Sequence, residues 1–199
     1  MALTLGDIRQ QASDLAAADF ELAYTAHVAN RGLLELGPFL RIIDKVEIDW
    51  PAGEEAMPAP DNVIEFRRTA TWRPLNANSF RRLRRVAVDS DKPGWWYDGL
   101  MIGLNPAPGA DGVFQVHYYR YPRLLSTADV SDAPEGGDIV AAALIQYVVA
   151  DYYAQQGDQE SRELATPFRA AFEQLKQQIA ATRARLINLA PDSWAAGDH

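Results

Sequence analysis

The sequence predicts an α+β fold in which a β-rich segment is inserted between two pairs of helices. Apolar residues recur at helical spacing before residue 37 and again over 138–189. Residues 40–125 instead alternate in polarity and are rich in aromatic and β-branched side chains, as strands are. Runs of one element type, without regular alternation of strand and helix, favour α+β over α/β.

The composition is that of a globular protein. Of the 199 residues, 48% are hydrophobic and 23% are charged, which is enough to build a core. We expect a single domain over 1–190, with helices in 5–36, a β-rich middle over 40–125 and helices over 138–189, followed by a C-terminal tail at 191–199. Cysteine is absent, so neither disulfides nor thiolate metal sites are available. We expect no signal peptide, because "MALTLGDIRQQ" lacks a basic region followed by an apolar segment. We expect no membrane partner, because no apolar run approaches roughly 18 residues.

Two helices are predicted before residue 37. Thr4 and Asp7 have the spacing of a capping box, which starts the first helix at about residue 5. Asp19 is positioned to cap the second helix, and Pro38 is expected to stop it after a glycine that ends the last turn. The apolar stripes are Ile8, Ala12 and Leu15, then Leu22, Ala23, Ala26 and Leu33, and the two candidate glycines are Gly32 and Gly37.

The middle segment contains five predicted strands and the loops that join them. The strands are expected at 43–50, 63–72, 79–88, within 100–112, and at 113–121. Residues 51–62 hold three prolines and one glycine and are expected to form a loop. The turn at 90–99 is expected to deliver Trp95, Trp96 and Tyr97 to a sheet edge, as an aromatic contact.

Two further helices are predicted near the C-terminus. Asp138 is positioned to cap the first of them, and Gly157 to end it. Pro167, with Thr166 as a new cap, is expected to break or kink the second. The stripe of this last helix is Leu164, Phe168, Phe172, Leu175, Ile179 and Leu186.

The charge layout points to contact with a partner. The net charge is −8, yet the stretch 67–85 carries seven basic residues, all arginine, and no acidic residue. A basic block in an acidic protein suits docking on an acidic surface, and arginine makes bidentate contacts well. The alternative is a solvated sheet face. We predict contact with an acidic partner surface or a neighbouring subunit through Arg67, Arg68, Arg81, Arg82, Arg84 and Arg85.

No motif for catalysis or cofactor binding is recognised. The glycine pairs lack the spacing of a phosphate loop, and the three histidines do not form a metal-binding pattern. We therefore expect neither enzymatic activity nor a cofactor, while an enzyme with unrecognised residues stays a weaker alternative. The arginine block mixes with aromatics, but the pI near 4.9 argues against sequence-specific nucleic-acid binding.

The ordered combination of segments resembles tailed-phage head–tail connector adaptors. An N-terminal helical pair leads into "MPAPDNVIEFRRTATWRPL", then "GWWYDGLMIGLNPAPGADGVFQVHYYRYPRLLS" and "DAPEGGDIVAAALIQYVVADYYAQQGDQESRELATPFRAAFEQL". The resemblance covers about four fifths of the chain. The arginine block and the "SWAAGDH" tail have no counterpart that we can assign.

The resemblance implies a structural virion protein that forms a twelvefold ring below the portal. Its partners would be the portal protein, a neck or stopper protein or a tail protein, copies of itself, and DNA in the lumen. The arginine block would then contact the portal or a neighbouring subunit, and the loop of Trp95, Trp96 and Tyr97 would lie on the tail side or between subunits. Surplus apolar stripes on the helices and separated charge blocks fit such contacts between copies. The alternatives are a neck stopper, a tail-completion protein, or a soluble bacterial binding domain that uses the Trp95–Tyr97 turn.

The C-terminal tail contains an aromatic residue, which near a chain end usually needs a pocket. We predict that the segment from about residue 186 contacts the portal or a neighbouring subunit, or else folds back on its own domain. The predicted contact residues are Leu186, Ile187, Leu189 and Trp194.

Overall fold

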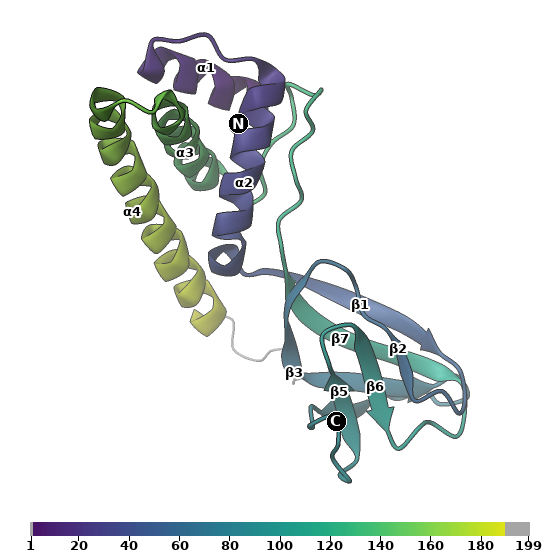
Figure 1. Cartoon of the computed structure of the whole chain (residues 1–199). Helices are drawn as coiled ribbons and strands as arrows, with labels where there is room; N and C mark the ends of the chain where they lie inside the picture. Colours follow the sequence, from purple (N-terminus) through teal and green to yellow (C-terminus); the bar gives the residue numbers. More distant parts are fainter. Residues whose placement is uncertain (1, 190–199) are drawn as a thin grey trace. The chain divides into compact units, whose positions relative to one another are not determined.

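The computed structural model describes residues 2–189, with side chains as far as residue 184 (Figure 1). The described residues form two compact units, one made of residues 2–41 and 122–189 and the other of residues 42–121. Helices come first, antiparallel strands occupy the middle and helices follow. The structure therefore confirms the predicted α+β fold with a β-rich insertion between two helical pairs.

The helical unit is built around its third helix. The helices are α1 (Leu5–Ala16), α2 (Leu22–Leu40), α3 (Asp138–Gln156) and α4 (Gln159–Leu189). Figure 1 shows α3 flanked by α2 and α4, and α3 also packs against α1. Buried residues occur around most of α3, as expected for a helix surrounded by others. Most residues of the described apolar stripes are therefore covered within this unit.

The helix ends confirm some predictions and correct others. The Thr4–Asp7 capping box is present, and Gly157 ends α3 in the left-handed conformation. Asp19 does not cap α2, which begins after Glu21, and Asp138 is the first residue of α3, where its carboxylate accepts the Leu3 amide at 3.1 Å. Leu15 and Leu164 of the predicted stripes are exposed, and so is Ala23.

Neither proline ends its helix, contrary to the prediction. Pro38 lies in the last turn of α2, which continues until Arg41 takes the left-handed conformation. Only one backbone bond is lost there, while Leu36 and Leu40 are fully buried in the helical core. Gly32 is not a terminator either, because Leu144 and Tyr147 pack 3.0–3.2 Å from where its Cβ would lie.

The last helix runs through Pro167 without the predicted break. The Thr166 hydroxyl donates to the Arg162 carbonyl at 3.0 Å, so it bonds within the helix rather than capping a new one. The helix is capped earlier, by Asp158, whose carboxylate accepts the Ser161 amide at 2.8 Å. Burial of Phe172 against α3 continues the packing beyond the proline.

The β unit consists of two antiparallel sheets. The strands are β1 (Ile42–Trp50), β2 (Ala56–Pro58), β3 (Val63–Pro74), β4 (Arg81–Arg84), β5 (Gly94–Tyr97), β6 (Met101–Asn105) and β7 (Gly112–Arg120). Their orders are β1-β7-β3-β4 and β2-β6-β5. The loop predicted over 51–62 contains β2, because Met57 packs against the core and Pro58 is tolerated at the end of an edge strand.

The two sheets share one aromatic core. On β7, Phe114, Val116 and Tyr118 are buried, as their alternation predicts. The Trp95 ring of β5 lies 5.7 Å from the Phe66 ring and 5.9 Å from the Phe114 ring, measured between centroids. The opposite face of the four-stranded sheet carries polar residues, including Gln115 and the β1 residue Glu47 beside it in register. This sheet therefore has one core face and one polar face.

Candidate interaction surfaces

A basic groove lies across β3 and β4. It has a volume of about 740 Å³, and its basic lining residues are Arg68, Arg84 and Arg85. The Arg85 amide donates to the Arg68 carbonyl at 2.9 Å, which holds the ends of the two strands together. Glu65 is the acidic residue of the lining. Since three guanidinium groups share this groove, it suits an acidic partner surface.

The other arginines that were predicted to contact a partner lie elsewhere in the β unit. Arg82 is exposed on β4, opposite Thr71. Arg67 is partly buried near His117, whose pKa is lowered by burial and then by the charges of Lys45 and Arg67. Arg81 lines a second groove, described below. The structure thus brings three of the six predicted arginines into one groove and separates the others.

The aromatic strand β5 is divided between core and surface. Trp95 is fully buried, so it serves the core instead of an exposed contact. Within the described residues its indole Nε1 has no hydrogen-bond partner. Trp96 and Tyr97 are partly exposed on the edge strand of the smaller sheet. The Arg85 guanidinium lies over the rings of Trp95 and Tyr97, at 5.5 and 5.8 Å from their centroids, which joins this strand to the basic groove.

The predicted C-terminal contact residues lie outside the described side chains. The backbone of 186–189 belongs to α4, and residue 190 onward is outside the described residues. The contact residues predicted there therefore stay a prediction: Leu186, Ile187, Leu189 and Trp194.

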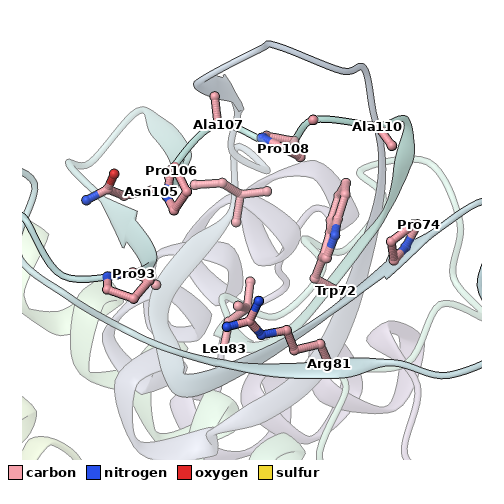
Figure 2. Close-up of a pocket in the computed structure, with 13 residues that line it drawn as sticks. Trp72, Pro74, Arg81, Leu83, Pro93, Asn105, Pro106, Ala107, Pro108 and Ala110 are labelled. Carbon is pink, nitrogen blue, oxygen red and sulfur yellow. The ribbon is translucent and has the colours of Figure 1, made fainter.

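Sequence reasoning missed a second groove, at the end of the β5–β6 pair. It has a volume of about 350 Å³, and Figure 2 shows Trp72 and Pro106 on its walls, with Arg81 and Leu83 below. Its residues come from four separate segments, so no local pattern marked them. Proline and alanine at 106–110 read as a turn in the sequence, while their place in the lining depends on the packing of two sheets.

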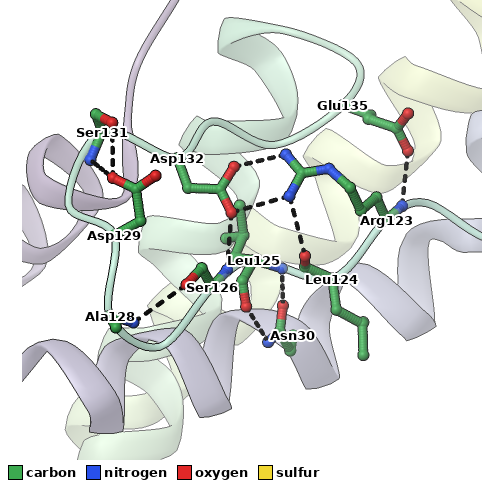
Figure 3. Close-up of polar contacts among 10 residues, drawn as sticks. All are labelled: Asn30, Arg123, Leu124, Leu125, Ser126, Ala128, Asp129, Ser131, Asp132 and Glu135. Atoms are coloured by element: carbon green, nitrogen blue, oxygen red, sulfur yellow. Dashed lines mark hydrogen bonds and ion pairs between the residues drawn. The ribbon is translucent and has the colours of Figure 1, made fainter.

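Sequence reasoning also missed a polar network in the connection between β7 and α3. The Arg123 guanidinium contacts both carboxylate oxygens of Asp132, at 2.5 and 3.0 Å (Figure 3). Asp132 Oδ2 also accepts the Ser126 amide at 2.7 Å. These hydrogen bonds lower the pKa of Asp132 to about 2, and the bond from Arg123 has the largest effect. The spacing of residues in the sequence could not reveal this ion pair, because Arg123 and Asp132 meet only when residues 123–132 fold into a compact loop.

The same loop is fastened to the helices. The Asn30 side chain of α2 accepts the Leu125 amide at 2.7 Å and donates to the Leu125 carbonyl at 3.0 Å. The Leu5 amide donates to the Asp132 carbonyl at 2.6 Å, which satisfies a free donor at the start of α1. The connection is therefore a structural part of the helical unit.

Polar side chains also join the helices to one another. The Tyr147 hydroxyl donates to Glu35 Oε1 at 2.8 Å, and the Arg169 guanidinium lies 3.1 Å from Glu35 Oε2. The Tyr24 hydroxyl donates to Asp151 Oδ2 at 3.4 Å, and burial followed by the Asp151 charge raises the pKa of Tyr24 to about 12. Each of these side chains has a structural hydrogen-bond or ion-pair partner. The raised pKa of Tyr24 is therefore explained without a catalytic role.

Among residues 2–189, no cluster of three or more metal-ligating side chains is found. The helices in this part of the chain include none that is both long and apolar enough to cross a membrane.

The comparisons with known proteins identify the family. None of the curated proteins matches the chain. The model of the SU10 adaptor protein family matches residues 3–194, which includes both helical pairs and the whole β unit. Because this match spans nearly the entire sequence, the chain belongs to the SU10 adaptor protein family, a family of phage adaptors.

Proposed function

We propose that the chain is a head-to-tail connector adaptor of a tailed phage. Copies of it form a twelvefold ring below the portal, and DNA passes through the lumen. The observation that carries the proposal is the family match over residues 3–194. On this proposal the protein acts in the virion neck as a structural component, without catalysis or a cofactor.

The arginine surfaces support a docking role. The groove of Arg68, Arg84 and Arg85 offers guanidinium groups at the surface of the β unit. Within the described residues, none of these three arginines takes part in an ion pair. Such a groove can receive carboxylates of the portal or of a neighbouring copy, and the complementary charge would set the orientation of docking.

The distribution of charge supports a separate role for the helices. A channel that lets DNA slide is better lined by acidic or neutral residues than by basic ones, since each phosphate contact strengthens binding. In the helical unit, the segment 1–41 carries 5 acidic and 3 basic residues, and 136–199 carries 8 and 5. We therefore assign the lumen to the helices and keep the arginine block away from it.

A reconstitution experiment tests the proposal. Purified chain is added to portal-containing heads that lack it, and the heads are recovered by sedimentation and imaged. We expect about twelve copies arranged as a ring directly below the portal. A chain that ignores these heads, or that joins only after another neck protein, contradicts the proposal; the latter result indicates a stopper or tail-completion protein.

A further inference from the structure

A single leucine projects from the tip of the β5–β6 hairpin. Leu100 is 80% exposed, the highest exposure among the large hydrophobic residues of the described chain. The turn that holds it is well ordered by hydrogen bonds. Asp98 Oδ1 accepts the amides of Leu100 and Met101 at 2.9 and 2.8 Å, and the Tyr97 hydroxyl donates to the Gly99 carbonyl at 2.9 Å. An apolar side chain on a fixed turn loses little conformational entropy when it is buried by a partner.

The groove of Figure 2 lies at the opposite end of the same hairpin. The two strands pair from Gly94 with Asn105 to Tyr97 with Ile102. The turn follows Tyr97, whereas the groove is lined by Gly94 and Asn105 at the other end. Since the paired strands separate the two features, Leu100 does not reach the groove of its own chain. Two copies that follow each other head to tail would bring them together.

The chemistry of the turn matches that of the groove. Leu100 is apolar, and the groove has apolar walls, including Trp72, Leu83 and Leu104. Next to Leu100, Asp98 carries a carboxylate whose pKa is lowered by the two amide hydrogen bonds, so it is charged at neutral pH. Arg81 is exposed at the groove and offers the opposite charge. Apolar and ionic complementarity therefore point to the same pairing.

We propose that Leu100 of one copy inserts into the groove of Trp72, Leu83 and Leu104 in the next copy, with Asp98 facing Arg81. This inference rests on the ring proposed above and specifies the contact that builds it. A contact between two different surfaces of identical chains leaves one turn and one groove unused at the ends of any open chain. Closure into a ring satisfies every turn and every groove.

Cross-linking tests the pairing directly, because the chain contains no cysteine. In the double variant Leu100→Cys with Ala107→Cys, each copy carries one thiol on the turn and one at the groove. After mild oxidation of the chain assembled on portal-containing heads, we expect a ladder of disulfide-linked oligomers on a denaturing gel. An equal mixture of the two single variants should give dimers and no larger species. As a matched control, Leu124→Cys with Ala107→Cys should give no ladder, since Leu124 is an exposed leucine of the other unit.

A charge variant gives a second, independent measurement. Leu100→Asp should weaken association between copies at least tenfold and leave thermal unfolding of the monomer unchanged, because the side chain is exposed. Leu124→Asp serves as the control and should leave association unchanged.

The outcomes separate this inference from the proposed function. If the wild-type chain forms rings on the portal while the double variant gives no ladder and Leu100→Asp assembles normally, the contact is wrong and the ring stands. If Ala107→Cys is captured by the portal or by a neck protein, the groove belongs to that partner and the contact is again wrong. If the wild-type chain forms no ring on portal-containing heads, the proposed function itself fails.

Discussion

Asp132 holds the connection between the β unit and α3 in one conformation. Its side chain is only 9% exposed and accepts hydrogen bonds from the Arg123 side chain and from the Ser126 amide. The Asp132 carbonyl accepts a hydrogen bond from the Leu5 amide at the start of α1. One residue thus links the geometry of the loop to the beginning of a helix far away in the sequence.

Replacement of Asp132 should give a pH-dependent loss of stability. Asp132→Asn is expected to lower the free energy of unfolding at pH 7 by about 1–3 kcal/mol, since hydrogen bonds to a charged group are lost. The pKa of Asp132 is about 2 in the folded protein, below its ordinary value of 3.8. Its stabilisation is therefore present above about pH 4 and is lost as the pH falls towards 2.

Urea unfolding midpoints at pH 7, 4 and 2.5 check this prediction. The difference between wild type and Asp132→Asn should shrink as the pH falls. The exposed residue Asp61 provides a control, and Asp61→Asn should change stability by no more than about 0.5 kcal/mol at pH 7. A difference that stays constant down to pH 2.5 would show that charge on Asp132 is unimportant.

The middle strand of the smaller sheet requires a residue without a side chain. Gly103 of β6 pairs with Trp96 of β5, whose ring covers it. A Cβ on Gly103 would lie 1.9 Å from Cε2 of that ring. The Trp96 ring can keep this position only if residue 103 is glycine. The placement of the partly exposed Trp96 side chain therefore depends on Gly103.

Gly103→Ala should therefore destabilise the β unit. We expect a loss of about 1–3 kcal/mol in the free energy of unfolding, because the tryptophan must leave its position. Gly109→Ala is the matched control, since nothing lies within 4 Å of its Cβ position and its φ angle is ordinary. Chemical denaturation monitored by tryptophan fluorescence measures both variants, and equal midpoints for them would contradict the prediction.

The sequence predicted whether each segment is a helix or a strand better than it predicted where the segment ends. The four helices and the alternating strands were predictable, because apolar periodicity and the Thr4–Asp7 capping box are local signals. Pro38 and Pro167 misled the assignment of ends, since burial of residues such as Leu40 and Phe172 outweighs one lost backbone bond. The strand β2 was hidden because its pairing partner, β6, lies more than 40 residues away.

The candidate surfaces were predictable only in part. A run of arginines shows in the sequence, but which of them share a groove depends on the pairing of β3 with β4. Trp95 and Trp96 are neighbours with the same side chain, yet one is in the core and the other at the surface, as strand alternation requires. The groove of Trp72 and Arg81 depends on the meeting of two sheets, which no local pattern encodes.

At the scale of the whole molecule, the arginine block should matter for assembly more than for folding. Arg82→Glu with Arg84→Glu is expected to reduce binding to portal-containing heads at least tenfold, because charge complementarity is reversed. Thermal unfolding should change little, since both side chains are exposed. A control with the same change in net charge is Arg9→Glu with Arg162→Glu, outside the block. Binding is measured by sedimentation with heads. Equal binding by both double variants would show that the arginine block is not part of the interface.

The C-terminal segment should also be needed for assembly. Deletion of residues 187–199 is expected to leave a folded chain that no longer joins portal-containing heads, because the predicted contact lies there. Circular dichroism measures folding, and sedimentation with heads measures joining. Trp194→Ala should reproduce most of the loss. Normal joining by the deleted chain would mean that this segment is dispensable for assembly.

The position of the β unit in the chain has a further consequence. It begins at Ile42 and ends at Tyr121, and Ile42 is paired with Arg120 at the open end of β1 and β7. The two points where the chain leaves this unit are therefore only about 5 Å apart. Such a segment can be excised, or exchanged for another of the same span, without stretching the helical scaffold. Replacement of residues 42–121 therefore gives this adaptor a route to new partners, while Arg41 and Pro122 keep their positions.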